Sequence, residues 1–408
     1  MPDLSYENLM KHGLTHEHLM KELNAYRDQA QGANGKSVEK ELAQETTIQQ
    51  KRESPLEPDA KYDSNLRSDN SSLSIPEPAA QTPLVQAPPA WYLDLKPQGF
   101  QMNMLGKTKK ATERQALIAL DSMKDCIARC EKEESPNQLD KFIEELRDHV
   151  HKAEFLEVNK YIVRKKNMLD NTGLPRIFDT RFPVDLRADA LQLYNRWYMQ
   201  IFSVDPLRGI IKDKNRVDKR NADRIDPSWP GRLSAKYYGQ GNLVIGQWWP
   251  TQLCTVRDGA HGAPQAGIYG EKDKGAYSIV LSGNANYKDE DKGDEIYYSG
   301  TDSKDSTPTE NTTRMIESCD TVKQAVRVIR SWNLNKSNPY RPVRGFRYDG
   351  LYTVVGYSLV NADKAIYRFH LVRLSGQDPI RYEDNAARRP TRFEVAKYDD
   401  LGLDERGF

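Results

Sequence analysis

Seven basic side chains with no acidic neighbour stand between Thr321 and Tyr348. In a chain whose net charge is only +1, this one-sided run indicates a local surface for an anionic partner. The phosphate backbone of a nucleic acid is the usual partner of such a surface, and a solvated charged face is the alternative. The residues that we expect to contact phosphate are Arg330, Lys336, Arg341, Arg344 and Arg347.

An acidic and aromatic segment, from Tyr287 to Gly300, precedes this basic run. A carboxylate of this segment can accept a hydrogen bond from the exocyclic amine of cytosine. Two of its tyrosine rings can sandwich a flat base. Together these groups suit a base that has been taken out of its stack. On spacing alone, a glycine-containing β-turn with solubilising acidic residues is the simpler interpretation.

The elements that must position these residues change in character along the chain. Residues 1–90 contain no Trp or Phe and carry nine basic against fourteen acidic residues, so we expect a disordered region. Residues 106–204 show helical apolar spacing, which predicts a small helical bundle. Residues 205–232 form a basic linker, interpreted as a solvated face or a bridge toward nucleic acid. Short β-rich runs over 233–381 predict a barrel or sandwich, and a polar tail, 382–408, follows.

Residues 233–381 also hold the motifs of a known family. The stretch from Gly239 to Arg381 resembles the SRA domain (SET and RING associated), also called the YDG domain, and its loops look most like fungal members. The matching segments are GQGNLVIGQWWPTQLCTVRDGAHGAPQAGIYGEKDKGAYSIVLSG, YKDEDKGDEIYYSGT, PVRGFRYDGLYTVVGYSLV and YRFHLVRLSGQDPI.

This resemblance implies both a fold and a function. The fold is α+β: a partly open, crescent-shaped β-barrel preceded by the helical bundle and the disordered N-terminal region. The function is that of a nuclear, non-enzymatic reader that binds double-stranded DNA, preferably methylated in a CpG context, and flips 5-methylcytosine into a pocket.

The resemblance also assigns the base pocket. Asp289, four residues before Gly293, takes the place of the carboxylate that reads the cytosine edge. Tyr298 and Ser299 match the second stacking aromatic and the hydroxyl beside it, and Tyr287 supplies the first ring. Family members read Gly-Gly-Tyr after the preceding strand, whereas this chain reads Ser-Gly-Asn-Ala-Asn-Tyr. The small residues expected to complete the pocket are Gly283 and Asn284.

Two loops that enter the DNA grooves are further implied. The first contains Gln265, Ala266 and Gly267, with Gln265 as the minor-groove wedge. The second lies between Ser303 and Arg314. It lacks the basic finger of hemimethyl-specific vertebrate members, and Arg314 is only a loose counterpart, so we do not expect strict hemimethyl specificity.

Other conspicuous residues of this region are interpreted as structural. Asp349 reads as part of a tight turn before a strand, which Tyr348 helps to brace. Trp248 and Trp249 are interpreted as packing residues. His261, between glycines, either contacts phosphate or caps a turn.

The four cysteines bear on whether the chain holds a metal-binding module. They are scattered, which excludes a RING module and favours a reducing compartment. Cys126 and Cys130 lie four residues apart on an expected helix, and without two further ligands in view they are interpreted as packing residues. We therefore expect no metal, no cofactor and no enzymatic activity.

The sequence also suggests partners other than DNA. Residues 1–232 are candidates for contacts with chromatin or histone-modifying proteins, and no segment is apolar enough to cross a membrane. The alternative functions are a chromatin-associated scaffold with a degenerate pocket, and the DNA-binding subunit of a ubiquitin-ligase or histone-modifying complex.

Overall fold

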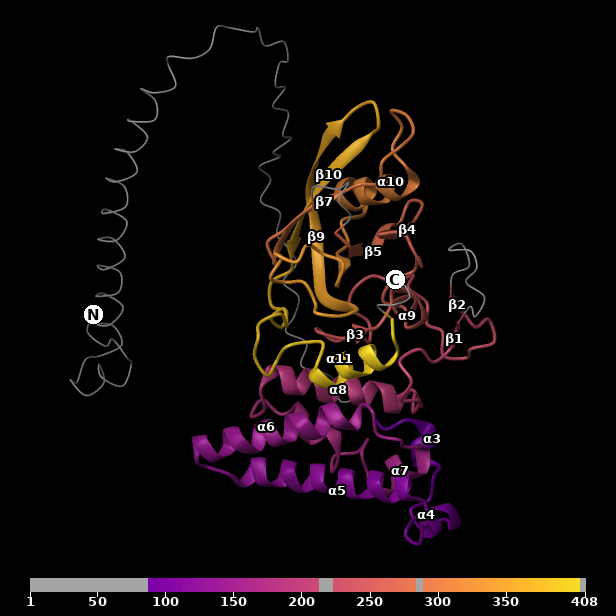
Figure 1. The fold of residues 1–408 in the computed structure, drawn as a ribbon, viewed down its shortest axis with the longest axis vertical. Coiled ribbons are helices and arrows are strands. Elements are labelled where there is room, and N and C mark those ends of the chain that lie inside the picture. Colours follow the sequence, from indigo (N-terminus) through magenta and orange to yellow (C-terminus); the bar gives the residue numbers. More distant parts are fainter. Residues whose placement is uncertain (1–86, 213–222, 284–288, 404–408) are drawn as a thin grey trace, which may run out of the picture. The chain divides into compact units, whose positions relative to one another are not determined.

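The computed structural model describes residues 87–212, 223–283 and 289–403. Helices lie N-terminal to an open, mixed sheet, which confirms the expected α+β class (Figure 1). The expected disordered region, 1–90, lies almost wholly outside the described residues, as do Asn284 and Tyr287. Within the described part of the chain, no helix is both long and apolar enough to cross a bilayer.

The N-terminal part of this structure is helical. Its helices are α3 (Ala90–Leu93), α4 (Phe100–Leu105), α5 (Ala111–Lys132), α6 (Pro136–Ala153), α7 (Lys160–Lys165) and α8 (Val184–Tyr198), with a 3-10 turn at Leu174–Phe178. α6 begins with a proline at its first position, where a missing N–H costs nothing. Apolar stripes on α5, α6 and α8 meet in one core, with Leu120, Leu146 and Trp197 among its buried members. The predicted helical bundle is thus observed.

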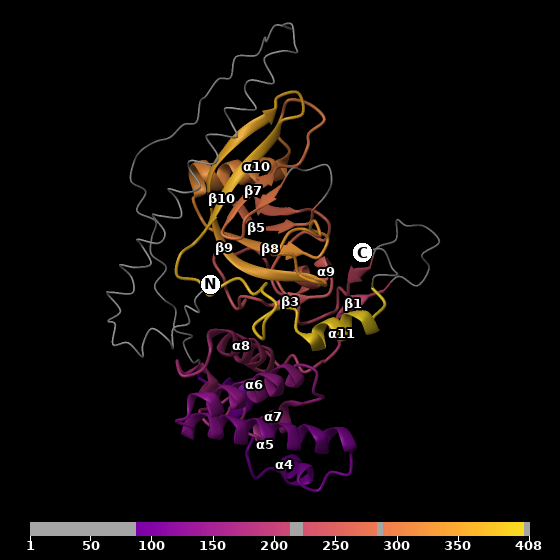
Figure 2. The same ribbon diagram turned by 60° about the vertical axis from the view of Figure 1, so that its left-hand side comes forward.

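The sheet contains eight strands. Seven follow the order β4 (Ile268–Glu271), β5 (Gly275–Leu281), β8 (Val326–Ser331), β9 (Phe346–Asn361), β10 (Ile366–Arg373), β7 (Glu295–Ser299) and β6 (Glu290–Asp291), and β3 (Trp248–Trp249) pairs with β9. β5 and β8 run parallel, and the other neighbours are antiparallel. The long strand β9 curves through the sheet and joins its two apolar cores (Figures 1 and 2).

Smaller elements surround the sheet. They are the ladder β1 (Ile210–Ile211) with β2 (Arg224–Ile225), the helices α9 (Gln252–Arg257), α10 (Glu310–Glu317) and α11 (Arg392–Asp400), and a π-helical turn at Ser318–Val322. α10 packs on β4 and β5, and α9 lies beside β3.

The segment read from sequence as a polar tail is packed into the structure. Arg389 is fully buried and forms ion pairs with Glu154 of α6 (3.0 Å), Asp189 of α8 (3.2 Å) and Glu394 of α11 (2.7 Å). Arg381 also binds Asp189, at 2.5 Å. Burial raises the pKa of Asp189, but the two guanidiniums outweigh it and hold that pKa well below its ordinary value. This ion network joins the sheet domain to the helices, and in Figure 1 α11 lies between α8 and β3.

Candidate nucleic-acid interface

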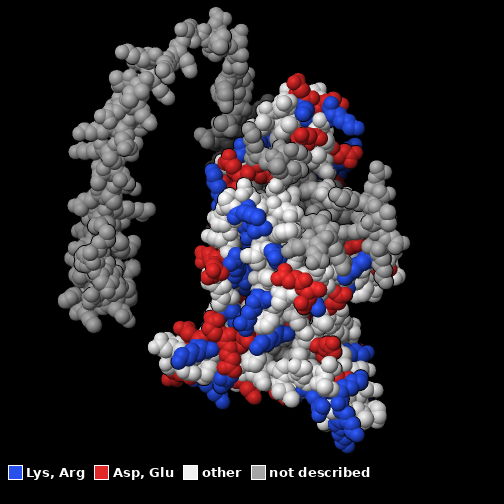
Figure 3. Space-filling model, in the orientation of Figure 1, with Lys and Arg blue, Asp and Glu red and all other residues white. Residues whose placement is uncertain are grey.

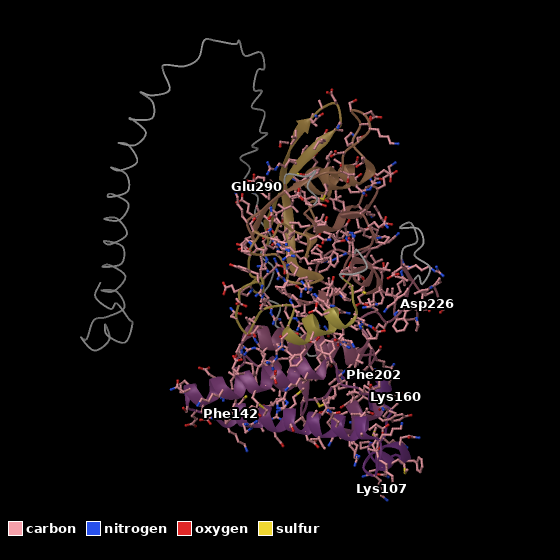
Figure 4. The ribbon with its side chains drawn as sticks, in the orientation of Figure 1. Lys107, Phe142, Lys160, Phe202, Asp226 and Glu290 are labelled. Carbon is pink, nitrogen blue, oxygen red and sulfur yellow. The ribbon has the colours of Figure 1, made fainter. Side chains whose placement is uncertain are left out.

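Asp289 is fixed against the end of β7. It lies directly before β6, and its Oδ1 accepts a hydrogen bond from the backbone amide of Ser299 at 2.7 Å. Burial raises the pKa of Asp289, whereas the hydrogen bond from Ser299 lowers it. A carboxylate has about four acceptor positions, so this bond leaves capacity for an incoming donor. Glu290, labelled in Figure 4, points away from the core and pairs with Arg368 at 2.9 Å.

Tyr298 precedes Ser299 on β7. Side chains alternate along β7, so Tyr298 is buried (6 % exposed) while Ser299 is half-buried. The hydroxyl of Tyr298 donates to the carbonyl of Val280 at 3.4 Å. A Cβ at Gly267 would lie 2.5 Å from this hydroxyl, so only glycine allows the chain to approach it so closely. The first predicted groove loop therefore ends directly against the predicted pocket.

Two side chains that the sequence did not single out for this task brace the groove loop from inside. Gln252 of α9 donates through Nε2 to the carbonyls of Ala263 (3.0 Å) and Ala266 (2.9 Å). Nε2 of His261 lies 2.9 Å from the same Ala266 carbonyl, and Nδ1 lies 2.8 Å from the hydroxyl of Ser278. His261 is fully buried, and this burial lowers its pKa to about 4. It braces the loop and cannot contact phosphate.

This bracing leaves Gln265 exposed at the tip of the loop, as a groove wedge requires. Ala266 is half-buried beside it, held by the bonds to its carbonyl. Gly283, on the other side of the site, has a positive φ of 63° at the end of β5. A Cβ there would lie 2.6 Å from the carbonyl oxygen of Asn333, which explains the glycine by backbone packing.

The predicted phosphate contacts divide into two groups, and for two residues the prediction is wrong. Arg330 and Arg347 have no exposed surface. Arg330 pairs with Asp291 (2.6 Å) and Asp349 (3.0 Å), and Arg347 pairs with Asp349 (2.6 Å). Their guanidiniums are neutralised inside the fold and cannot reach a phosphate. In the view of Figure 3, basic and acidic side chains are interspersed over the sheet and do not form a single basic face.

The other three predicted contacts lie at the surface. Lys336 is exposed. Arg341 is half-buried and donates to the carbonyl of Trp332. Arg344 is partly exposed and pairs with Asp399 at 3.1 Å. All three thus keep exposed surface, which a contact with phosphate requires.

Arg314 does not stand at the tip of a loop. It lies within α10, and its Nη1 is 3.0 Å from Glu317. Its side chain is only 12 % exposed because it runs along the helix. The prediction that Arg314 enters a groove is therefore wrong for this structure.

The family tripeptide is also placed differently from the expectation. Tyr348 and Asp349 lie inside β9, at a bulge opposite Val328 and Ile329, and not in a turn before the strand. Gly350 follows with a φ of 117°, where a Cβ would lie 2.6 Å from Gln377 Oε1. Asp349 is the shared acceptor of Arg330 and Arg347, so the motif stabilises the sheet. Trp248 and Trp249 are both buried, as expected of packing residues.

Part of this chain is similar in sequence to known proteins. Residues 237–377 match the model of the SAD/SRA domain. The E3 ubiquitin-protein ligase UHRF2 of Mus musculus is 32 % identical over 192 residues, which are 40 % of this chain and 24 % of that protein. The UHRF1-like protein of Cryptococcus neoformans is 29 % identical over 166 residues, 35 % of this chain and 47 % of that protein. The match thus spans about a quarter of the mouse relative and about half of the fungal one.

Solved structures match a comparable share of this chain. The modification-dependent TagI restriction endonuclease is 29 % identical, with a TM-score of 0.30 over 35 % of this chain and 54 % of that one. The SUVH5 SRA domain in complex with methylated CHH DNA is 28 % identical, with a TM-score of 0.30 over 36 % of this chain and 99 % of that one. The family model and the relatives in sequence agree on one assignment: residues 237–377 of this chain are an SAD/SRA domain.

Proposed function

We propose that this SRA domain reads methylated cytosine in double-stranded DNA by taking the base out of the duplex into the site beside Asp289. The observation that carries the proposal is the junction of pocket and groove loop: Asp289 is held by Ser299, and Gly267 of the loop abuts Tyr298. In this proposal, a base that leaves the stack at Gln265 enters the site beside Asp289.

The chemistry of the pocket follows from its groups. Removing a cytosine from the stack costs a few kcal/mol of free energy, and contacts in the pocket must offset this cost. Asp289 would accept a hydrogen bond from the cytosine amine, where thymine has a carbonyl oxygen and would be repelled. Tyr298 would form a wall of the pocket, and Ser299 would flank the base. Gln265 is an exposed planar amide that can pair with the orphaned guanine.

Backbone contacts would position the duplex. Lys336, Arg341 and Arg344 supply the phosphate contacts in this proposal, since Arg330 and Arg347 are buried. Phosphate contacts fix the register of a protein on DNA without reading sequence, so methyl preference must come from the pocket. A nuclear location follows from this function.

A second candidate function is favoured by the names of the relatives. UHRF2 is an E3 ubiquitin-protein ligase, and the match spans only part of it. The chain would then be the DNA-binding part of a ubiquitin-ligase or histone-modifying assembly, with its helices or N-terminal residues as the contact to partners. Both candidates require the DNA-reading step.

A titration with two readouts tests that step. The full chain is titrated with duplexes carrying unmodified, hemimethylated or fully methylated CpG, at two salt concentrations. In parallel duplexes, 2-aminopurine beside the target reports unstacking by an increase in fluorescence. We expect tighter binding of methylated duplex, together with the fluorescence increase. Equal affinity for all three duplexes would reject methyl reading. Preference without a fluorescence change would reject base flipping.

A further inference from the structure

Two pairs of metal-ligating side chains face each other between α5 and α6, far in sequence from the SRA domain. Cys126 and Cys130 lie four residues apart on α5, and Glu145 and His149 lie four residues apart on α6. Residues with this spacing share one face of a helix. Since α5 packs directly on α6, the two pairs converge.

The ligand atoms are already close together. Cys126 Sγ, a carboxylate oxygen of Glu145 and a ring nitrogen of His149 all lie within 4.8 Å of one another. Nε2 of His149 is 3.6 Å from Oε1 of Glu145. Cys130 lies outside this group of three; it stands one turn further along α5, is likewise buried, and offers a second sulfur on the same helix. Among the described residues, this is the one place where at least three such groups meet in this way.

The four side chains differ in their exposure to solvent. Both cysteines are fully buried, whereas His149 is half-buried and Glu145 is exposed. The Cys126 thiol donates to the backbone carbonyl of Phe142 at 3.4 Å, and Figure 4 labels Phe142 on this pair of helices. An ion could therefore enter past Glu145 and His149 and reach the sulfurs from the solvent side.

We propose that Cys126, Cys130, Glu145 and His149 form a structural zinc site that joins α5 to α6. Sulfur, imidazole and carboxylate together are a ligand set that zinc takes, whereas magnesium and calcium prefer oxygen alone. Zinc–ligand bonds of about 2.0–2.3 Å place tetrahedral ligands roughly 3.3–3.8 Å apart. The side chains would need to draw together by about 1 Å, which rotation about their own bonds allows.

Arg129 completes the site electrostatically. Its guanidinium forks onto both oxygens of Glu145, with donor–acceptor distances of 2.9 and 2.5 Å. Glu145 can bind zinc through one oxygen and keep Arg129 on the other, in the manner of outer partners that orient metal ligands. The charges then balance, because two thiolates and one carboxylate face a divalent zinc and one guanidinium.

From the sequence, Cys126 and Cys130 are interpreted as packing residues because no further ligands are in view near them. The two missing ligands lie on the next helix, and only the turn between α5 and α6 brings them opposite the thiols. A site of this kind would stabilise the helical region and would be independent of DNA reading.

Cobalt substitution tests the proposal on the full chain. The protein is stripped of metal, shown to be folded by circular dichroism, and titrated with Co²⁺. We expect about one equivalent to bind, with a thiolate-to-cobalt charge-transfer band and the intense visible bands of tetrahedral cobalt, all displaced by zinc. A wild-type protein that binds no cobalt, or that shows only weak octahedral bands, would overturn the site.

Ligand variants locate the metal. Cys126→Ala with Cys130→Ala should abolish the charge-transfer band, and Glu145→Gln or His149→Gln should weaken cobalt binding roughly 10- to 100-fold or more. The matched controls are Cys319→Ala and Glu144→Gln, which lie outside the group and should leave binding unchanged. If a ligand variant does not fold, the wild-type protein decides: zinc should raise its melting temperature, and a chelator should reverse the rise. An unchanged melting temperature, or an unchanged band in a folded double variant, would reject the proposal.

Discussion

Arg330 and Asp291 form a buried bidentate ion pair, with Nη2 of the arginine 2.6 Å from Oδ1 of the aspartate. The basic run and the acidic segment, which look like separate surfaces in the sequence, thus meet inside the fold. Arg330 also donates to the carbonyl of Gly293 at 2.8 Å, so it holds the acidic segment that follows Asp289. A residue expected to bind DNA instead positions the loop that would bind the base.

The first prediction concerns this pair. Asp291→Asn should lower the free energy of unfolding by about 3 kcal/mol, because it leaves a buried guanidinium with one partner fewer. Asp349 continues to pair with Arg330, which keeps the loss near the low end of the range for broken buried pairs. Urea denaturation measures it. The neighbouring Glu290→Gln, at an exposed position, should change stability by no more than about 0.5 kcal/mol. Equal effects of the two changes would contradict this role of Asp291.

The second prediction concerns the choice of base. Asp289→Asn should reduce affinity for methylated duplex by about 1–3 kcal/mol and leave affinity for unmodified duplex nearly unchanged. The reason is that asparagine can keep the bond to the Ser299 amide but presents no charged acceptor to the cytosine amine. Paired titrations of wild type, Asp289→Asn and the control Glu290→Gln measure the ratio of affinities. The same ratio in all three proteins would show that Asp289 does not read the base.

How far the sequence predicts this protein depends on the distance between interacting residues. The stripes that bury Leu120, Leu146 and Trp197 are local, and their period is visible in the chain. The motif match likewise anticipates the open sheet. The partners of Arg330 and Arg347 could not be predicted from a count of charges between Thr321 and Tyr348. That count omits Asp349, directly after the run, and Asp291, which belongs to the distant acidic segment.

The same reasoning applies to the candidate sites. Gln252 donates from α9 to the carbonyls of Ala263 and Ala266 in the groove loop. The residues around Gln252 in the sequence do not indicate these hydrogen bonds. The role of Asp289 stays a prediction, and it depends on a spacing to Gly293 that matches a family pattern. The pairing of Cys126 with Glu145 and His149 depends on the packing of two helices, which periodicity alone does not fix.

The third prediction separates surface from buried arginines. Arg344→Ala and Lys336→Ala should each weaken binding to all duplexes and lower the slope of log affinity against log salt by about one unit. Arg347→Ala should instead destabilise the domain, because Asp349 loses a buried partner. Affinity measured over a series of salt concentrations, with Arg392→Ala as an exposed control beside α6, checks this division. An unchanged salt slope in both surface variants would remove these residues from the DNA contact.

The last prediction follows from the buried His261. Burial lowers its folded-state pKa to about 4, whereas the unfolded chain titrates near the ordinary value of 6.5. Between pH 6.5 and pH 4, His261 is therefore mostly protonated in the unfolded chain and mostly neutral in the folded domain. The stability due to this group is complete above pH 6.5 and is lost as the pH falls toward 4, by on the order of 3 kcal/mol.

His261→Gln removes the titrating group while keeping an amide that can donate to Ala266. It should be less stable at pH 7 but should lose less stability between pH 6.5 and 4.5 than the wild type. Denaturation of both proteins at several pH values measures the difference. Parallel pH profiles would show that His261 is not the group whose protonation lowers the stability of the domain.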